Sequence, residues 1–200
     1  MNTSALFEKI TDALLKDGYI ILEDALPQTL TNNLLTFAKQ ENNYKNAAIS
    51  KTTTAHVDST KRSDKTKWID PTNATLQEYL DTMSQLQTHL NRSLYLGLSY
   101  YEAHFALYEQ GDFYEKHLDS FRGKKNRVVT TVYYLNDNWK SEDGGELIIY
   151  DKNAKEIQRV VPKANTLVVF MSEDFPHEVL PAKKQRYSIA GWFRVDKKLI

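Results

Sequence analysis

The clearest candidates for chemistry in this sequence are two polar side chains that lie close together, His117 and Asp119. The segment from Tyr114 to Asp119 is alternating and flanked by polar residues, so we expect a short strand or strand end. Side chains two apart on a strand share a face, which places the imidazole beside the carboxylate. His177, much later in the chain, supplies a third ligand. Two histidines and one carboxylate form the set that holds iron(II) on one face and leaves its other positions open.

Arg186 follows this last histidine and is a candidate counter-ion for an anion bound beside the metal. On the predicted last strand it shares a face with Ser188, Ala190 and Trp192, and we expect that face to point inward. A guanidinium that points inward is costly unless an anion meets it. Considered alone, Tyr134 is better explained as an ordinary core residue, but beside Arg186 it becomes a candidate hydroxyl donor to the same anion.

Other interpretations of these residues fit the sequence less well. A zinc protease motif needs a second histidine at position 181, which is Pro181. The acid-rich and amide-rich stretch 136–146 lacks the glycine and the bidentate glutamate of a calcium loop, so a solvated turn is expected. His104 has no ligand-like neighbours and is expected to be a packing residue. A lone His-x-Asp is common by chance, so the metal hypothesis depends on His177 and Arg186.

The composition limits the kinds of site and partner. Two hundred residues suffice for one domain with a sizeable core, and no stretch resembles a linker, so residues 1–200 are expected to form a single domain. The 26 basic and 26 acidic residues cancel, which gives no indication of a nucleic acid or an anionic membrane as partner. Cysteine is absent, so any metal must be held by His, Asp or Glu.

The first apolar stretch carries Glu8, Lys9 and Asp12. It therefore has no uncharged region typical of an export signal and no run long enough to span a bilayer. Together with the absence of cysteine, this favours a cytoplasmic protein. The oligomeric state is left open by the sequence.

The first half of the chain, residues 1–97, is predicted to be mainly helical support. Apolar residues recur at helical spacing after Ser4, after Pro27, and most clearly from Leu76 to Leu94. Residues 43–67 are mostly Thr, Ser, Lys, Asn and Asp, which predicts a mobile functional loop rather than a packed element.

From residue 98 onward the pattern becomes strand-rich. Turn signals separate eight short runs, at 100–108, 113–119, 127–136, 146–151, 156–161, 166–171, 177–180 and 186–195. This spacing predicts a mainly β, α+β fold in which residues 98–195 form a jelly roll or barrel and the helices pack on one sheet. The strand from Val128 to Leu135 is apolar on both faces, as expected when one face lines an interior and the other meets helices.

Five motifs occur in a distinctive order and spacing. They are His117-Leu118-Asp119, Tyr133-Tyr134-Leu135-Asn136, Asp143-Gly144-Gly145-Glu146-Leu147, Pro176-His177-Glu178-Val179 and Arg186-Tyr187-Ser188-Ile189-Ala190-Gly191-Trp192-Phe193. Together they resemble the 2-oxoglutarate and iron(II)-dependent oxygenases, most of all the prolyl hydroxylases that act on hypoxia-inducible factor and their bacterial relatives. The upstream segment Arg62-Ser63-Asp64…Trp68 is similar to the Arg-Gly-Asp…Trp segment of the loop that closes over substrate in that subgroup, with Ser63 in place of the usual glycine.

The resemblance implies a double-stranded β-helix that uses iron(II), 2-oxoglutarate and dioxygen, with ascorbate as reductant. It assigns the metal to His117, Asp119 and His177, and the distal carboxylate of 2-oxoglutarate to Arg186 and Tyr134. The remaining expected site residues are Tyr108, Tyr114 and Val132 in the cofactor pocket and Arg62, Asp64, Trp68, Arg127 and Trp192 in the substrate region. An ion pair between Asp64 and Arg127 is expected to set the position of the mobile loop.

Three hypotheses on function follow. The first is hydroxylation of a prolyl residue in a protein, and since bacterial relatives modify elongation factor Tu, a translation factor is a plausible partner. The second is an oxygenase that acts on a small molecule or another residue type. The third is a non-enzymatic jelly-roll binding module. A segment 62–68 that lies against the metal site favours the first hypothesis, and one folded away from it favours the second.

Overall fold

The computed structural model describes residues 3–50, 55–56, 58–120 and 126–195. This part of the chain contains three α-helices, α1 (Thr3–Lys16), α2 (Gln28–Gln40) and α3 (Ala74–Leu94), and one 3-10 turn, η1 (Ser141–Asp143). The strands before and just after α3 are β1 (Tyr19–Leu22), β2 (Lys45–Asn46), β3 (Ile49–Ser50), β4 (Ala55–His56), β5 (Lys65–Trp68) and β6 (Tyr100–Tyr108). The later strands are β7 (Tyr114–His117), β8 (Arg127–Tyr134), β9 (Leu147–Tyr150), β10 (Glu156–Val160), β11 (Leu167–Met171), β12 (His177–Val179) and β13 (Arg186–Arg194).

Local chemistry explains where the helices begin and end. Asn73 caps α3, because its side-chain oxygen accepts a hydrogen bond of 2.9 Å from the N–H of Leu76. Gly18 ends α1 with a φ of 78°, a conformation that suits glycine, and its N–H donates to the carbonyl of Ala13. Pro27 occupies the N-cap position of α2. The sequence predicts the helix that follows Pro27, whereas Asn73 was not singled out as a cap.

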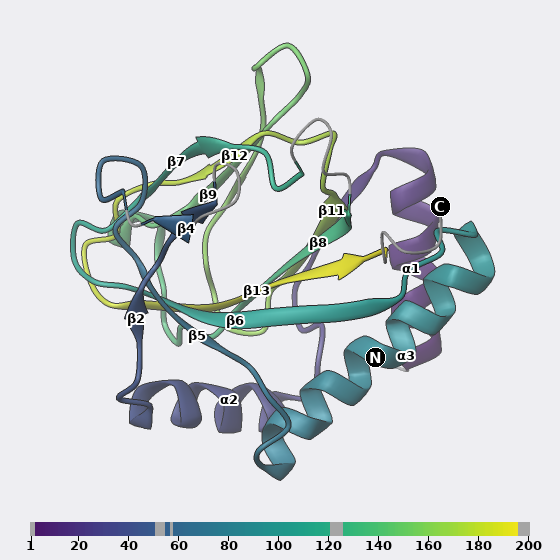
Figure 1. The fold of residues 1–200 in the computed structure, drawn as a ribbon, viewed down its shortest axis with the longest axis horizontal. Helices are drawn as coiled ribbons and strands as arrows, with labels where there is room; N and C mark the ends of the chain where they lie inside the picture. Colours follow the sequence, from purple (N-terminus) through teal and green to yellow (C-terminus); the bar gives the residue numbers. More distant parts are fainter. Residues whose placement is uncertain (1–2, 51–54, 57, 121–125, 196–200) are drawn as a thin grey trace.

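Two sheets make up the β part of the molecule. The major sheet has seven strands in the order β1-β11-β8-β13-β6-β5-β2, and the minor sheet has four in the order β10-β9-β12-β7. Figure 1 shows α2 and α3 on one side of the major sheet, with β7, β9 and β12 on the other. Each sheet contains four of the eight strands predicted after residue 98. The predicted jelly roll is therefore confirmed, as two facing open sheets rather than a closed barrel.

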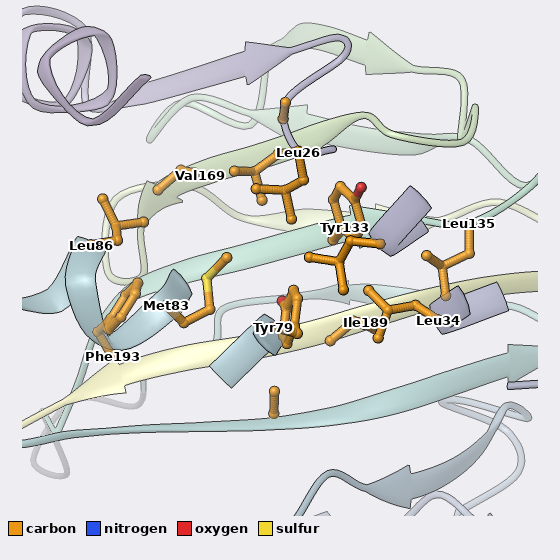
Figure 2. Packing of buried hydrophobic residues seen from close by; sticks show 14 of the residues in the cluster. Leu26, Leu34, Tyr79, Met83, Leu86, Tyr133, Leu135, Val169, Ile189 and Phe193 are labelled. Carbon is orange, nitrogen blue, oxygen red and sulfur yellow. The ribbon is translucent and has the colours of Figure 1, made fainter. Parts of the chain in front are cut away.

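The alternation of side chains along β8 and β13 divides the apolar residues into two clusters. Tyr133, Ile189 and Phe193 face the helices and pack with Tyr79 and Met83 of α3, as Figure 2 shows. The opposite face of the same strands packs between the two sheets, in a cluster that includes Ala106, Tyr108, Val132, Tyr134, Leu147, Ile149, Val168, Phe170 and Val179. The sequence predicts this two-sided burial, because both faces of β8 are apolar.

The segment predicted as a loop, residues 43–67, contains regular structure. β5 pairs antiparallel with β6, so that Trp68 lies opposite His104, and β2 pairs with β5. Residues 51–54 and 57 lie outside the described part of the chain. The prediction of a loop without packed elements is therefore wrong for β5. Backbone pairing with β6 stabilises a strand whose polar side chains give little indication of one.

Candidate active site

The three predicted metal ligands converge where the minor sheet meets the interior. His117 ends β7, Asp119 follows it, and His177 begins β12, which pairs with β7 so that the two histidines lie opposite each other. One ligand atom from each residue lies within 4.8 Å of the others. The Nε2 atoms of His117 and His177 lie 3.7 and 3.6 Å from the carboxylate oxygens of Asp119. This is the arrangement of a two-histidine, one-carboxylate metal site.

The tautomers of both histidines suit metal binding. Nδ1 of His117 donates to the carbonyl of Glu115 at 2.7 Å, and Nδ1 of His177 donates to the carbonyl of Phe175 at 3.0 Å. With Nδ1 engaged as a donor, Nε2 carries a lone pair that points toward Asp119. The donor set therefore fits a divalent ion such as iron(II).

Electrostatics keep His117 and Asp119 in the charge state that a metal needs. Burial, followed by the neighbouring His177, lowers the pKa of His117, so its imidazole is neutral at pH 7. Burial alone would raise the pKa of Asp119, but His177, His117 and Arg127 together hold it below its ordinary value. Asp119 is therefore ionised.

Two buried hydroxyls orient the carboxylate. Oγ1 of Thr130 donates to Oδ2 of Asp119 at 2.8 Å, and the same hydroxyl lies 2.8 Å from Oγ of Ser172. Both hydroxyl residues are almost completely buried. Thr130 thus holds Oδ2 of Asp119, which lies 3.6 Å from Nε2 of His177, while Oδ1 lies 3.7 Å from Nε2 of His117.

Arg186 provides a buried positive charge on the interior face of the major sheet. Its side chain is 1% exposed, Nε donates to the carbonyl of Gly145 at 2.9 Å, and Nη1 donates to Oγ of Ser188 at 3.1 Å. Within the part of the chain that the structure describes, no carboxylate forms an ion pair with this guanidinium. A buried cation without an acidic partner fits an anionic ligand with a carboxylate group.

Aromatic residues surround Arg186, as the sequence predicts. Its Cζ atom lies 4.7 Å from the ring centroid of Tyr108 and 5.1 Å from that of Tyr134. The hydroxyl of Tyr134 is buried and has no hydrogen-bond partner among the described residues, so it is available to a ligand. Burial raises the pKa of Tyr134 to about 12, with Arg186 acting in the opposite direction, so the hydroxyl remains a donor. Val132 lies in the same interior cluster.

Tyr114 lies on the metal side of the pocket rather than beside Arg186. Its ring stacks on the imidazole of His117, with ring centroids 3.6 Å apart and an angle of 15° between the planes. Arg62 covers the other face of the tyrosine ring, at 4.2 Å from its centroid. The predicted cofactor residue therefore contacts a metal ligand directly.

Trp68 and Trp192, both predicted for the substrate region, form an aromatic cluster with His104. The ring of His104 lies 5.2 Å from Trp68 and 5.4 Å from Trp192, and the two indoles are 6.4 Å apart. Trp68 is 52% exposed, whereas the other two rings are buried. An apolar wall that opens to solvent suits a side chain presented from outside the protein.

The predicted ion pair between Asp64 and Arg127 is not formed. Asp64 is instead paired with Arg62, whose Nε and Nη2 donate to its two oxygens at 2.7 and 2.6 Å. Arg127 stacks over Trp192 at 3.7 Å, and its Nη2 donates to Glu102 at 3.4 Å. The expectation was wrong because Arg62, only two residues away along the chain, forms a two-pronged hydrogen bond with Asp64.

The sequence did not single out Thr130, Ser172 or Gly145 as site residues. A signal existed for Thr130, which shares a strand face with Val132 and Tyr134 and is the polar member of that face. Ser172 and Gly145 contact the site through turns, and only the folded chain shows which side chains they meet.

Comparison with known proteins agrees with this chemistry. The family model described as the 2OG-Fe(II) oxygenase superfamily matches residues 103–194. The chain is similar to a crystal structure of a prolyl-4-hydroxylase from Pseudomonas putida, with 37% identity, a TM-score of 0.86, and coverage of 95% of this chain and 99% of that one. It is also similar to a Trichoplax adhaerens prolyl hydroxylase in complex with a peptide fragment of the hypoxia inducible factor oxygen degradation domain, with 27% identity, a TM-score of 0.84 and coverage of 98% and 91%.

Among curated proteins, the chain is 34% identical over 140 residues to Egl nine homolog 1 of Homo sapiens, across 66% of this chain and 33% of that protein. It thus spans about a third of the length of this relative. The Pseudomonas putida enzyme, in contrast, is matched along almost its whole length. Members of the superfamily require iron(II), 2-oxoglutarate and dioxygen, and the observed ligand set fits that requirement. The chain therefore belongs to the 2-oxoglutarate and iron(II)-dependent oxygenase superfamily, and prolyl hydroxylases are among its relatives.

Proposed function

We propose that this protein hydroxylates a prolyl residue in a protein substrate, at an iron(II) held by His117, Asp119 and His177. The observation that carries the proposal is the convergence of these three groups in the same interior as Arg186, a buried cation without an acidic partner in the described residues. These three side chains bind the metal. Arg186, with the hydroxyl of Tyr134 as a second donor, provides for the distal carboxylate of 2-oxoglutarate.

When bound, iron(II) with 2-oxoglutarate and dioxygen supplies the oxidation that converts a substrate C–H bond to C–OH. The protein's own residues position these reactants and exclude water. The carbonyls of Glu115 and Phe175 fix the two imidazoles, and Thr130 fixes the carboxylate. The apolar cluster between the sheets, which includes Tyr108 and Tyr134 beside Arg186, provides a water-poor interior. No protein acid, base or nucleophile is needed for the reaction.

The position of segment 62–68 favours a protein substrate over a small molecule. Arg62 forms an antiparallel bridge with Tyr114, beside the metal ligands, and Trp68 lies against Trp192. The segment is therefore folded against the site, where it can contact a chain that carries the target proline. The Trichoplax adhaerens relative, solved with a peptide fragment, supports the same kind of substrate.

A translation factor such as elongation factor Tu is the first candidate for the target, on the basis of the resemblance to bacterial prolyl hydroxylases. Ascorbate as reductant and a cytoplasmic location are part of the same proposal. Within the described residues, no helix is long and apolar enough to cross a membrane.

The test is to incubate the protein with iron(II), ascorbate, 2-oxoglutarate and a cell lysate, and to search the lysate proteins by mass spectrometry for added oxygen on prolyl residues. Purified elongation factor Tu serves as a defined substrate in a parallel reaction. We expect hydroxyproline in at least one protein, and none with Asp119→Ala, because that variant lacks the carboxylate ligand.

The same reactions distinguish the alternatives. Turnover of 2-oxoglutarate without oxygen on any prolyl residue would contradict the prolyl substrate and leave the oxygenase chemistry intact. If succinate formed at the same rate with wild-type protein and Asp119→Ala, the proposed metal site itself would be wrong.

A further inference from the structure

The segment Lys61–Trp68 contacts the metal ligand His117 through two connections that the reaction chemistry does not require. The first runs through side chains. Asp64, 1% exposed, holds the guanidinium of Arg62 with two hydrogen bonds, and that guanidinium lies 4.2 Å from the ring centroid of Tyr114. The tyrosine ring stacks at 3.6 Å on the imidazole of His117. Arg62, Tyr114 and His117 thus form a three-layer stack, in which Arg62 comes from the segment Lys61–Trp68 and the two rings come from β7.

The second connection runs through the backbone. The carbonyl of Lys61 accepts a hydrogen bond of 2.8 Å from the N–H of Glu115, and the carbonyl of Glu115 accepts the Nδ1 proton of His117 at 2.7 Å. The segment therefore contacts both the neighbour that stacks on the face of the imidazole and the peptide that fixes its edge. A shift of the segment away from β7 would loosen both constraints on His117.

Ser63 strengthens the attachment of this segment to β7. Its N–H donates to the carbonyl of Phe113 at 3.1 Å, and its hydroxyl oxygen accepts a hydrogen bond of 3.1 Å from the N–H of the same residue. A glycine at this position would keep the backbone bond and lose the hydroxyl bond. The serine therefore adds a contact that holds Arg62 and Asp64 in place.

We propose that Arg62 is a positioning residue for the metal centre, so that the order of segment Lys61–Trp68 and metal binding at His117 stabilise each other. The inference rests on the proposed role of His117 as a metal ligand. Metal binding fixes the imidazole and thereby the stack, and the stack in turn presents Nε2 to the metal. Because the coupling is an equilibrium property, each event must favour the other by the same factor. The order of the segment that we expect to contact the substrate therefore depends on whether a metal is bound.

The first test uses apo-protein and cobalt(II), which is stable in air. Arg62→Lys keeps a positive charge for Asp64 but lacks the flat, two-pronged group that stacks on Tyr114. We expect cobalt(II) to bind this variant about tenfold more weakly, as is typical when a group that orients a metal ligand is lost. The visible absorption of the bound cobalt should change as well, because His117 is less firmly oriented.

Three further variants make the test specific to the stack. Tyr114→Leu removes the middle layer and should weaken cobalt(II) binding as Arg62→Lys does, whereas Tyr114→Phe keeps the ring and should retain wild-type affinity. Lys61→Gln is the matched control. It removes an exposed ion pair between the same segment and Glu115 and does not touch the stack, so it should bind cobalt(II) like the wild type.

Hydrogen exchange of the wild-type protein gives a second measurement that needs no variant. Amides of Lys61–Trp68 should exchange more slowly with cobalt(II) than without it, and this difference should disappear in Tyr114→Leu. Equal exchange with and without metal, or unchanged cobalt(II) affinity in both Arg62→Lys and Tyr114→Leu, overturns the coupling. If His177→Ala binds cobalt(II) as tightly as the wild type, the proposed metal site is wrong, and the inference falls with it.

Discussion

His117 and His177 each engage Nδ1 with a backbone carbonyl two residues earlier, so the β7 and β12 backbones decide where the Nε2 atoms point. Asp119 is oriented in a comparable way, through the hydroxyl of Thr130. At the scale of single residues, a hydrogen bond with another part of the chain therefore orients each proposed ligand. Loss of such an outer contact typically weakens metal binding by about 10- to 100-fold.

Thr130→Val tests this arrangement, because valine has nearly the same shape without the hydroxyl. The change removes the buried hydrogen bonds of Thr130 to Oδ2 of Asp119 and to the hydroxyl of Ser172, so the free energy of unfolding should fall by about 2 kcal/mol. Cobalt(II) affinity should fall by about tenfold. Urea denaturation and metal titration measure the two effects. Thr130→Ser restores the hydroxyl and should recover most of both losses, and equal behaviour of the serine and valine variants would contradict the role given to the hydroxyl.

His104 predicts a pH dependence of stability. Burial, with a further contribution from Arg62, lowers the pKa of His104 from 6.5 to about 4, while Asp64 acts in the opposite direction and Arg127 in the same direction as Arg62. Between these two pH values the unfolded chain binds a proton that the folded chain does not. The free energy of unfolding should therefore decrease as the pH falls from about 6.5 to about 4, by about 3 kcal/mol from this group.

The measurement is urea denaturation of apo-protein across that pH range, for the wild type and for His104→Leu. The variant lacks the titrating imidazole, so its unfolding free energy should fall less steeply toward low pH, and the difference between the two curves isolates His104. Parallel curves would show that His104 does not bind its proton more weakly in the folded state.

Residues whose side-chain type itself requires a ligand or a partner could be predicted from the sequence. Contacts that depend on which residues the fold brings together could not. His117, Asp119, His177 and Arg186 are side chains that need a ligand or a partner, so their spacing alone indicates a site. The pairing of Asp64 with Arg62 depends on which cation the fold brings nearer, and nothing in the sequence ranks the two candidates.

At the scale of elements, the turn before β9 positions Arg186. Gly145 has a φ of 70°, and its carbonyl accepts the Nε proton of Arg186. A Cβ atom at this position would lie 3.0 Å from Cδ of Arg186 and 3.1 Å from Cβ of Ala182. The turn thus brings the backbone close to the arginine in a way that only glycine permits.

Gly145→Ala should therefore raise the concentration of 2-oxoglutarate needed for half-maximal turnover by about tenfold, the equivalent of one weakened charge-assisted hydrogen bond. Cobalt(II) affinity should not change. Gly111→Ala is the matched control, since Gly111 also has a positive φ, of 90°, but no atom lies within 4 Å of the added methyl group. That variant should lose stability through backbone strain and keep its 2-oxoglutarate requirement, and a similar rise in both variants would contradict the contact with Arg186.

The elements themselves were predicted to different degrees, for a physical reason. Apolar alternation reports burial, and most of the eight strands after residue 98 are largely buried, so their order and approximate bounds follow from the sequence. β5 contains Lys65, Thr66 and Lys67, and it is a strand because β6 offers an unpaired edge. The backbone hydrogen bonds of β6 stabilise β5 whatever its side chains are, so the sequence of β5 does not indicate a strand.

At the scale of the whole molecule, the metal site and the main core lie on different sheets. The histidine ligands come from β7 and β12 of the minor sheet, whereas the helices pack against the major sheet. β7 is an edge strand of only four residues, so its order should depend on the metal more than that of the long, central β13 does.

Removal of the metal should therefore loosen the molecule unevenly. Hydrogen exchange of metal-loaded protein before and after treatment with a chelator should show faster exchange in β7 and β12 and little change in β6 and β13. Thermal denaturation should show a lower midpoint after chelation, by mass action on the folded state. Equal loss of protection in β6 and β13 would mean that the site stabilises the whole fold rather than the minor sheet.

The most direct test of the account is a crystal structure of the protein with manganese(II), which resists oxidation, and 2-oxoglutarate. We expect the metal bound to Nε2 of His117, a carboxylate oxygen of Asp119 and Nε2 of His177, with the distal carboxylate of 2-oxoglutarate on Arg186 and the hydroxyl of Tyr134. Metal held by other residues, or 2-oxoglutarate bound away from Arg186, would contradict the account.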